Sequence, residues 1–283
     1  MPGPRLTVAD LPRRALMGVV NATPDSFSDG GRFYAPDAAI AHGLALAAAG
    51  AAVLDIGGES TRPGAEPVDA VEEMRRVVPV VRALAADTDA AVSIDTTKAE
   101  VARAALDAGA LMVNDVSGGT RDPGMRALVA RGDAAYVVMH MRGTPQTMQQ
   151  QANYGDVVAE VGVALRELVT DAVAAGIDPS AIWADPGIGF AKTAEHNLDL
   201  LRALPQLSST VGAPLIVGAS RKSFLGKVLG DASEDRDDAT LATTVWSFLH
   251  GVAIVRVHDV ESSRRAIELL DVMERMTPEG RAA

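Results

Sequence analysis

Polar side chains that could bind or transform a ligand recur in this 283-residue chain directly after short apolar runs. A single Asp or Asn in such a place often does no more than cap the following helix. Repetition along the whole chain is difficult to explain by capping alone, and it predicts one shared site. The residues concerned are Asn21, Glu59, Thr61, Arg62, Asp95, Asn114, His140, Asp185, Ser220, Lys222, Arg256 and His258.

These residues could recognise two kinds of chemical group, the edge of a heterocyclic ring and an anion. Asp95, Asn114 and Asp185 supply acceptors and one amide, which suit the edge of a planar heterocycle with several N–H donors, such as an aminopyrimidinone. Buried groups with strict hydrogen-bond demands also discriminate strongly against wrong ligands. The positive residues Arg62, Lys222, Arg256 and His258 could hold an anion, and a pyrophosphate fits them well.

Oxygen ligands for a metal ion are concentrated after the first apolar run. Asn21, with the nearby Asp25 and Asp29, could help to bind Mg²⁺, which prefers oxygen ligands and pyrophosphate oxygens. Asp55 is a different case because it lies inside an apolar run. A buried carboxylate needs a partner, so Asp55 is expected to be either an internal hydrogen-bond acceptor or part of the site.

The elements that carry these residues alternate between short apolar runs and amphipathic helices. The runs are apolar on both sides, as expected for strands covered by helices. Eight strand–helix units favour a single-domain α/β fold, a closed (β/α)8 TIM barrel, whose active sites lie at the carboxyl ends of the strands. The predicted strands are Ala15–Val20, Ala52–Ile56, Ala91–Ile94, Leu111–Val113, Ala135–Met139, Ala181–Ala184, Pro214–Val217 and Ala253–Val257.

An open doubly wound sheet is the alternative, although the G-x-G-x-x-G turn that such sheets often carry is missing from the sequence. The helices are predicted from apolar residues at three-and-four spacing. These stripes are Val71, Met74, Val78, Val81 and Leu84; Val157, Val161, Leu165, Leu168 and Ala172; and Ile267, Leu270 and Met273. We expect one catalytic domain over residues 15–276, preceded by an extension, 1–14, and followed by a tail, 277–283.

Composition excludes several classes of function. The chain contains no cysteine, which rules out disulfides, thiolate metal sites and thiol catalysis. The net charge of −11 argues against a general nucleic-acid or anionic-membrane surface. No apolar run reaches the roughly 18 residues of a membrane span, and no signal peptide is evident. We therefore expect a cytoplasmic protein without nucleic-acid or membrane partners.

Two long polar loops make the sequence recognisable. Residues 21–33 and 57–67 are rich in turn formers, as barrel loops that act as lids often are. The segments Asn21–Gly31 and Asp55–Gly64 resemble the two signatures of the dihydropteroate synthase family. Further matches in the family's order are Ser93–Thr96, Val113–Gly119, Met139–Pro145, Asp185–Phe190, Gly218–Ser223 and Arg256–Val260.

The resemblance implies a binding role for residues throughout the barrel. The pterin pocket would be formed by Asp95, Asn114, Met139, Asp185, Phe190, Gly218 and Lys222. The pyrophosphate would be held by Asn21, Arg62, Arg256 and His258, with Asn21 also a ligand of Mg²⁺. The p-aminobenzoate pocket would be formed by Thr61, Pro63, Phe190, Lys222 and Ser223.

The resemblance also implies an activity. The enzyme would join 6-hydroxymethyl-7,8-dihydropterin pyrophosphate to p-aminobenzoate by dissociative substitution, as a homodimer and as a target of sulfonamides. Catalysis would depend on Asp29, Arg62, Lys222, Arg256 and His258. The alternatives are a catalytically silent pterin-binding paralogue, a pterin-dependent methyltransferase barrel and, without the loop signatures, a generic phosphate-binding barrel.

Overall fold

Parallel strands form the centre of the computed structural model, which describes residues 6–23, 36–62, 64–230 and 236–275. Neighbouring strands pair in the order β6-β5-β4-β3-β2-β1-β8-β7. A parallel bridge between Ala184 and Leu215 joins β6 to the segment before β7 and closes the ring. The predicted (β/α)8 barrel is therefore confirmed, and the open sheet is wrong. The strands are β1 (Ala15–Asn21), β2 (Val53–Gly57), β3 (Ala91–Asp95), β4 (Met112–Asp115), β5 (Ala135–Met139), β6 (Ile182–Asp185), β7 (Ile216–Val217) and β8 (Ile254–Val257).

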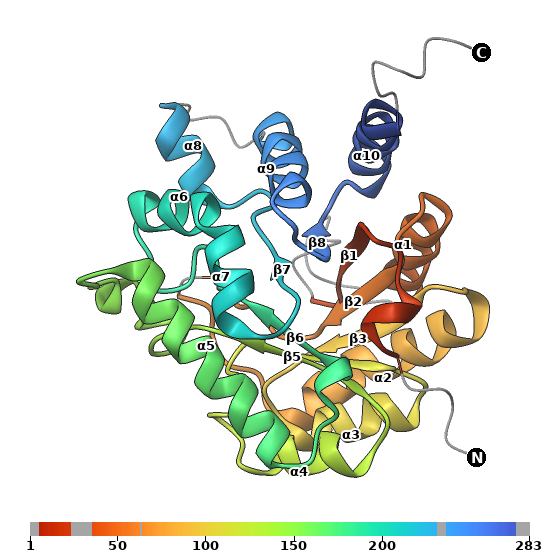
Figure 1. Cartoon of the computed structure of the whole chain (residues 1–283). Helices are drawn as coiled ribbons and strands as arrows, with labels where there is room; N and C mark the ends of the chain where they lie inside the picture. Colours follow the sequence, from red (N-terminus) through yellow and green to blue (C-terminus); the bar gives the residue numbers. More distant parts are fainter. Residues whose placement is uncertain (1–5, 24–35, 63, 231–235, 276–283) are drawn as a thin grey trace.

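Helices surround the barrel (Figure 1). They are α1 (Pro36–Ala48), α2 (Ala70–Asp87), α3 (Ala99–Asp107), α4 (Gly124–Arg131), α5 (Val157–Ala174), α6 (Ala194–Arg202), α7 (Leu204–Val211), α8 (Ser223–Leu229), α9 (Asp237–Leu249) and α10 (Val260–Arg275), with 3-10 turns at Val8–Asp10, Met148–Gln151 and Pro179–Ala181. Two of the longest begin at an Asp cap: Asp69 accepts from Glu72 N in α2, and Asp156 accepts from Val158 N in α5. Within the described residues, none of these helices has the length and apolarity needed to cross a membrane.

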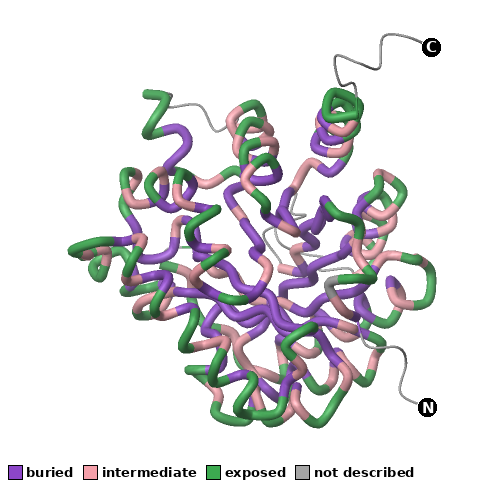
Figure 2. Tube along the Cα trace, viewed as in Figure 1, coloured by how far each residue is buried: buried purple, intermediate pink, exposed green. Residues whose placement is uncertain are grey.

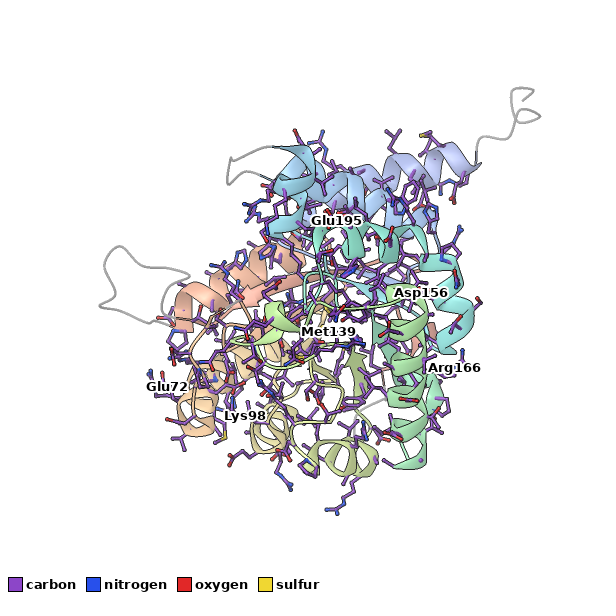
Figure 3. The ribbon with its side chains drawn as sticks, turned by 90° about the vertical axis from the view of Figure 1, so that its left-hand side faces the viewer. Glu72, Lys98, Met139, Asp156, Arg166 and Glu195 are labelled. Atoms are coloured by element: carbon purple, nitrogen blue, oxygen red, sulfur yellow. The ribbon has the colours of Figure 1, made fainter. Side chains whose placement is uncertain are left out.

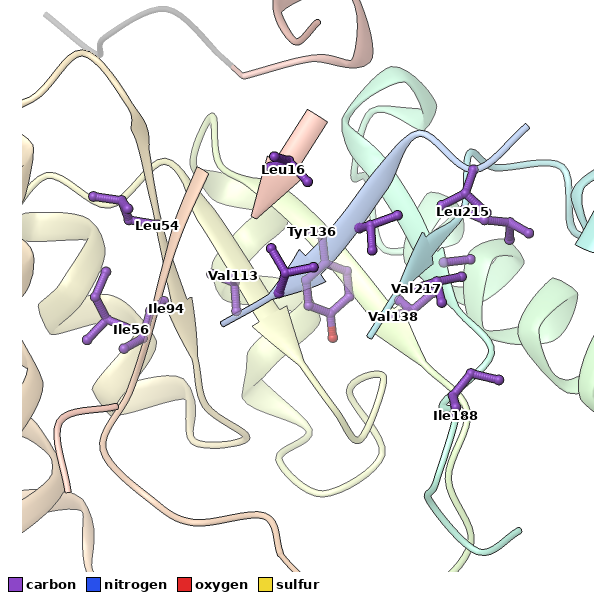
Figure 4. Close-up of a cluster of buried hydrophobic side chains, with 14 of the residues drawn as sticks. Leu16, Leu54, Ile56, Ile94, Val113, Tyr136, Val138, Ile188, Leu215 and Val217 are labelled. Atoms are coloured by element: carbon purple, nitrogen blue, oxygen red, sulfur yellow. The ribbon is translucent and has the colours of Figure 1, made fainter. Parts of the chain in front are cut away.

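Two apolar layers alternate along the strands because successive strand side chains point to opposite faces. The outer layer packs against the helices and includes Leu54, Ile56, Val113 and Tyr136 (Figure 4). The inner layer fills the barrel near the amino ends of the strands, with Met17, Val53, Ala91, Met112, Ala135, Val137, Trp183, Ile216 and Ile254. Figure 2 shows the buried residues concentrated on the central strands and the exposed residues on the outer sides of the helices. Polar inner side chains therefore lie above this layer, from the middle of the strands to their carboxyl ends.

The segment before β1 packs against the amino end of the barrel. Leu6 is buried in the inner apolar cluster, and Leu11 packs against it. Arg14 is also buried and forms ion pairs with Asp271 and Glu274 of α10. The first and last described segments of the chain are thus joined, and the barrel is closed at its amino end. The predicted tail, 277–283, lies outside the described residues.

The structure corrects several boundaries and burial predictions. Strand β7 is shorter than the predicted Pro214–Val217, in part because proline has no N–H to donate to a ladder. Most other strands begin or end one residue later than predicted. In α2, Val71 is 73% exposed, whereas Val77 and Val80 are buried. Met273 near the end of α10 is 62% exposed. Both wrong predictions fall on the terminal turn of a helix, where the helix extends past the barrel and its apolar stripe loses its partner.

Candidate active site

The inner side chains at the carboxyl ends of β1 to β4 lie in one row. Asn21 is in register with Gly57, Gly57 with Asp95, and Asp95 with Asn114. The last two fall an even number of residues beyond inner apolar positions of their own strands, so they point into the barrel. Asp185 ends β6 across the same opening. The structure therefore brings together the acceptors that the sequence singled out.

Beneath this row, Asp55 is the centre of a buried polar network. Its carboxylate is fully buried and accepts from Ser93 Oγ at 2.7 Å, Asn114 Nδ2 at 3.0 Å and Arg256 Nε at 2.7 Å. Arg256 also donates from Nη2 to Asp95 Oδ2 at 3.1 Å. The sequence left two interpretations of Asp55, an internal hydrogen-bond acceptor or part of the site. The structure shows the first of these. It holds Asn114 and Arg256 in the positions from which they face the opening.

The charges in this network are strongly coupled. Burial, followed by repulsion from Asp55, raises the pKa of Asp95 to about 7, and the attraction of Arg256 only partly opposes this. Burial alone would lower the pKa of Arg256, but Asp55 and Asp95 more than offset it, so its pKa is raised. Gly218 lies beside this cation, and a β-carbon there would be in ordinary van der Waals contact with Cβ of Arg256, 3.7 Å away. The pKa of Asp95 therefore lies close to neutral pH.

Lys222 and Phe190 form the opposite wall of the opening. Lys222 Nζ lies 4.5 Å from the centroid of the Phe190 ring and donates to the carbonyl of Ile188. Burial lowers the pKa of Lys222 to about 8, although the Asp185 carboxylate opposes the change. Burial raises the pKa of Asp185, with Lys222 the first of the groups that oppose it. Met139 packs with Phe190 in a small apolar cluster and lies near the middle of the view in Figure 3. This wall offers a flat apolar surface beside one cation.

A third group of residues gathers positive charge around His258. Burial, followed by the charges of Arg256, Arg221 and Arg62, lowers the pKa of His258 to about 4. Ser220 Oγ accepts from the His258 backbone N–H at 3.3 Å and lies 2.9 Å from its Nδ1. The direction of this second bond depends on the imidazole tautomer, and a hydroxyl proton directed at Nδ1 would leave the imidazole proton on Nε2. A neutral N–H donor among guanidinium groups is suited to a phosphate oxygen.

The loop between β2 and α2 is fixed at its base by a buried ion-pair cluster. Lys98 Nζ contacts Glu59 of this loop and lies 2.5 Å from Glu73 of α2. Arg76 also donates to the carbonyl of Gly58 at 2.9 Å. Figure 3 shows Lys98 on the α2–α3 side of the molecule, away from Met139. The cluster sets the direction in which the loop leaves the barrel.

Near the tip of this loop, Gly64 N donates to the carbonyl of Pro145 at 3.1 Å, so the loop touches the segment after β5. Thr61 is half-buried and Arg62 is exposed. Ser223 is exposed at the first residue of α8, next to Lys222. Asp25, Asp29 and Pro63 lie outside the described residues. The binding roles of all these residues stay predictions.

A magnesium site can be tested only against the donors that the structure describes. No cluster of three or more Asp, Glu or His side chains suited to a metal occurs in the described ranges. Asn21 contributes one amide oxygen at the rim, on the row that leads to Asp95. Mg²⁺ is commonly bound by one or two protein oxygens together with substrate phosphates and water. Asn21 therefore fits a site that a bound pyrophosphate would complete.

Sequence reasoning missed two features of this region. Lys192 is buried, and its ammonium lies 3.1 Å from His140 Nδ1. His140 was noted at the end of a strand but received no role, and Lys192 received no attention because it lies in a loop. A lysine two residues after the Gly-Ile-Gly-Phe turn was the available signal. The Glu59–Lys98–Glu73 cluster was also missed, because its members are far apart in the sequence.

Comparison with known proteins agrees with this architecture. The family model described as pterin binding enzyme matches residues 17–258. The dihydropteroate synthase of Mycobacterium leprae is 52% identical over 262 residues, which cover 90% of this chain and 92% of the relative. A Xanthomonas albilineans dihydropteroate synthase structure with 4-aminobenzoic acid has a TM-score of 0.88 and 44% identity, covering 96% of both chains. A Yersinia pestis dihydropteroate synthase in a sulfonamide drug complex has a TM-score of 0.87 and 39% identity, covering 96% of this chain and 97% of that one.

The barrel, its carboxyl-end site and the family match define a class: the chain belongs to the pterin-binding enzymes. Within that class, the 52% identity to a dihydropteroate synthase, over nine-tenths of the chain, places the protein in the dihydropteroate synthase family. Members of this family are transferases of a pterinylmethyl group. The sequence-based assignment of family, fold and enzyme class is therefore confirmed.

Proposed function

We propose that this protein condenses 6-hydroxymethyl-7,8-dihydropterin pyrophosphate with p-aminobenzoate, giving 7,8-dihydropteroate and pyrophosphate in folate biosynthesis. One observation carries the proposal. The acceptors Asp95, Asn114 and Asp185 share an opening with the cationic group around His258. A ligand with a hydrogen-bonding ring at one end and an anion at the other matches both halves of that opening. Lys222, over Phe190, lies beside the pterin acceptor Asp185, where the second substrate would approach.

The proposed reaction breaks one bond before it forms the next. The C–O bond between the pterin methylene carbon and the pyrophosphate breaks, and the pyrophosphate leaves with the electron pair. The amino nitrogen of p-aminobenzoate then forms a C–N bond to that carbon and loses a proton. Arg62, Arg256 and the Nε2–H of His258 stabilise charge on the departing oxygens, while Asp95 and Asp185 stabilise the cationic pterin. Such a reaction requires no protein nucleophile.

A bound Mg²⁺ would neutralise part of the pyrophosphate charge, with Asn21 as its protein ligand. Isothermal titration with pyrophosphate in the presence and absence of Mg²⁺ tests this assignment. The wild-type protein should bind pyrophosphate more tightly with the ion, and Asn21→Ala should lose most of that difference. An undiminished magnesium effect in Asn21→Ala would remove Asn21 from the metal site.

The first test of the function is an assay of pyrophosphate release from the dihydropterin pyrophosphate with Mg²⁺ and p-aminobenzoate, with the product identified by mass. Dihydropteroate formation supports the proposal. A folded protein that binds the pterin but forms no product would instead be the silent paralogue. Since the second substrate is the group that sulfonamides resemble, they should compete with p-aminobenzoate in the same assay.

Pterin affinity should depend on the ionisation of Asp95. Because the pKa of this carboxyl is about 7 without ligand, it is increasingly protonated below that pH and then loses its full strength as an acceptor. Affinity should fall by up to about tenfold for each pH unit below this value. Asp95→Asn should bind more weakly and show a flatter profile, whereas Asp107→Asn, on the exposed end of α3, should match the wild type. An unchanged profile in Asp95→Asn would assign the titration to another group.

We also propose that the protein is a homodimer. Trp246 and Leu249 of α9 are 43% and 53% exposed, and Leu269 of α10 is 61% exposed. A groove of about 460 Å³ between these helices is lined mainly by apolar side chains. Exposed apolar patches of this kind commonly mark interfaces. Sedimentation should give twice the chain mass, and Leu269→Glu should give the single-chain mass. Val163→Glu, on an exposed position of α5, is the control; a monomeric wild type would reject the dimer.

The cytoplasmic location and the lack of nucleic-acid and membrane partners, which were expected from the sequence, stay predictions.

A further inference from the structure

The loop from β6 to α6, residues 186–193, has an unusual backbone. Gly187, Gly189 and Ala191 all have positive φ angles, of 69°, 84° and 50°. The first two are glycines, which adopt this region freely, but Ala191 is not, and it is fully buried. Non-glycine residues stay in such conformations only where the surrounding structure fixes them. The contacts of this loop show what fixes it.

Three successive carbonyls of the loop each accept a hydrogen bond from a side chain. Lys222 Nζ donates to Ile188 O, Gln149 Nε2 to Gly189 O at 3.3 Å, and Lys192 Nζ to Phe190 O at 2.9 Å. Lys222 follows β7 and Gln149 follows β5, so the donors come from separate parts of the barrel. The path of the loop is therefore set by side chains and not by a strand or helix ladder.

Lys192 is the most deeply buried of the three donors, with 4% of its surface exposed. Its ammonium has three N–H groups, and three acceptors lie around it: Phe190 O at 2.9 Å, His140 Nδ1 at 3.1 Å and His140 O at 3.4 Å. The loop also packs tightly on His140, since a β-carbon at Gly187 would lie 2.0 Å from its carbonyl oxygen. The ammonium therefore joins the end of β5 to the carbonyl of Phe190.

We propose that Lys192 is a positioning residue for the aromatic amine substrate, acting through Phe190 and Lys222. The inference rests on the proposed function, because Phe190 and Lys222 are the shared wall of the second-substrate pocket. Lys192 fixes the backbone that presents the Phe190 ring to the Lys222 ammonium. Of the pterin acceptors, Asp95 and Asn114 lie on β3 and β4, away from this loop, whereas Asp185 directly precedes it. The Lys192 charge is one of the groups that oppose the effect of burial on Asp185, so pterin binding is expected to respond as well, but less. Loss of Lys192 should therefore affect the amine more than the pterin.

Lys192→Met keeps an unbranched side chain as far as Cε and removes the ammonium with its three donors. We expect its KM for p-aminobenzoate to rise at least about tenfold, since displacements near 1 Å at a site can cost a hundredfold. The Kd for the pterin pyrophosphate with Mg²⁺, measured by titration calorimetry, should rise by a smaller factor than KM, because Asp95 and Asn114 lie away from the loop. Lys227→Met, an exposed lysine of α8, is the matched control and should resemble the wild type in both quantities. An equal rise in KM and Kd, or no rise in KM, would overturn the proposal.

A double-mutant cycle separates this role from general stabilisation. Because Lys192 acts through Phe190, the effect of Lys192→Met on KM should be much smaller in a Phe190→Ala background than in the wild type. Additive effects would contradict the proposal.

A second pair of variants covers the case in which Lys192→Met does not fold. His140→Asn keeps an acceptor close to the position of Nδ1 and should retain a near-wild-type KM, whereas His140→Leu should raise it. Equal KM values in these two variants would reject the role of the Lys192–His140 contact. All comparisons are ratios to an active wild type, so a wild type without turnover would contradict the proposed function and not this inference.

Discussion

Lys222→Met is expected to lower kcat/KM by about a hundredfold to a thousandfold, since single electrostatic groups in enzyme sites are commonly worth a factor of 10² to 10³. Lys222 is the first of the groups that oppose the effect of burial on Asp185, and it also lies over Phe190. Its loss would leave Asp185 more readily protonated and the aromatic wall without its cation. Pterin binding and amine capture should therefore both weaken, unlike the selective effect expected for Lys192.

Steady-state kinetics of Lys222→Met, Lys222→Arg and Lys227→Met measure this effect. Arginine keeps the charge but not the compact geometry of an ammonium, so Lys222→Arg should recover only part of the activity. Lys227→Met should be close to the wild type. Near-wild-type kcat/KM in Lys222→Met would remove this residue from the site and would also weaken the case for the shared wall.

Asp55→Ala is expected to destabilise the protein by about 3–5 kcal/mol, the usual cost of breaking a buried ion pair by removing one partner. Arg256 Nε, Asn114 Nδ2 and Ser93 Oγ would all lose an acceptor. Arg256 would retain only its contact with Asp95 in the network, so the geometry of the opening should change along with the stability.

Urea unfolding of Asp55→Ala, compared with that of Asp107→Ala, tests this prediction. Asp107 is an exposed aspartate at the end of α3, and its replacement should change the unfolding free energy by less than about 0.5 kcal/mol. Two equally stable variants would show that the Asp55 network does not stabilise the fold. Asp55→Asn should lie between the extremes, because its amide oxygen can still accept the bonds from Asn114 and Arg256, while its NH2 group faces Ser93 Oγ.

The residues at strand ends were predictable because a barrel brings its strand ends together whatever the loops do. Asp95, Asn114 and Asp185 needed only the strand positions, and errors of one residue at the boundaries did not move them to another face. Asp55 was recognisable as a buried carboxylate, but its partner was not. Arg256 lies 201 positions further along the chain, and only the closure of β8 onto β1 brings the two side chains together.

Loop geometry was much less predictable. The carbonyls of residues 188–190 are positioned by Lys192, Gln149 and Lys222, and no periodic pattern in the sequence encodes such contacts. The exposed ends of α2 and α10 show that helix periodicity also has a limit as a predictor of burial. Val71 and Met273 continue an apolar stripe beyond the point at which anything packs against it, and periodicity alone cannot show where that point is.

The apolar side chains that fill the amino end of the barrel affect the order in which the substrates can bind. Below the Asp55 network the barrel is filled by Met17, Met112 and Trp183, and Leu6 packs in the same cluster. In the described part of the chain, access from the amino end is therefore blocked, and a ligand would reach the acceptors from the carboxyl ends of the strands. If p-aminobenzoate binds against Phe190, as proposed, it would lie between the pterin acceptors and the solvent and would block entry of the pterin. The two substrates should then bind in a fixed order, with the pterin first.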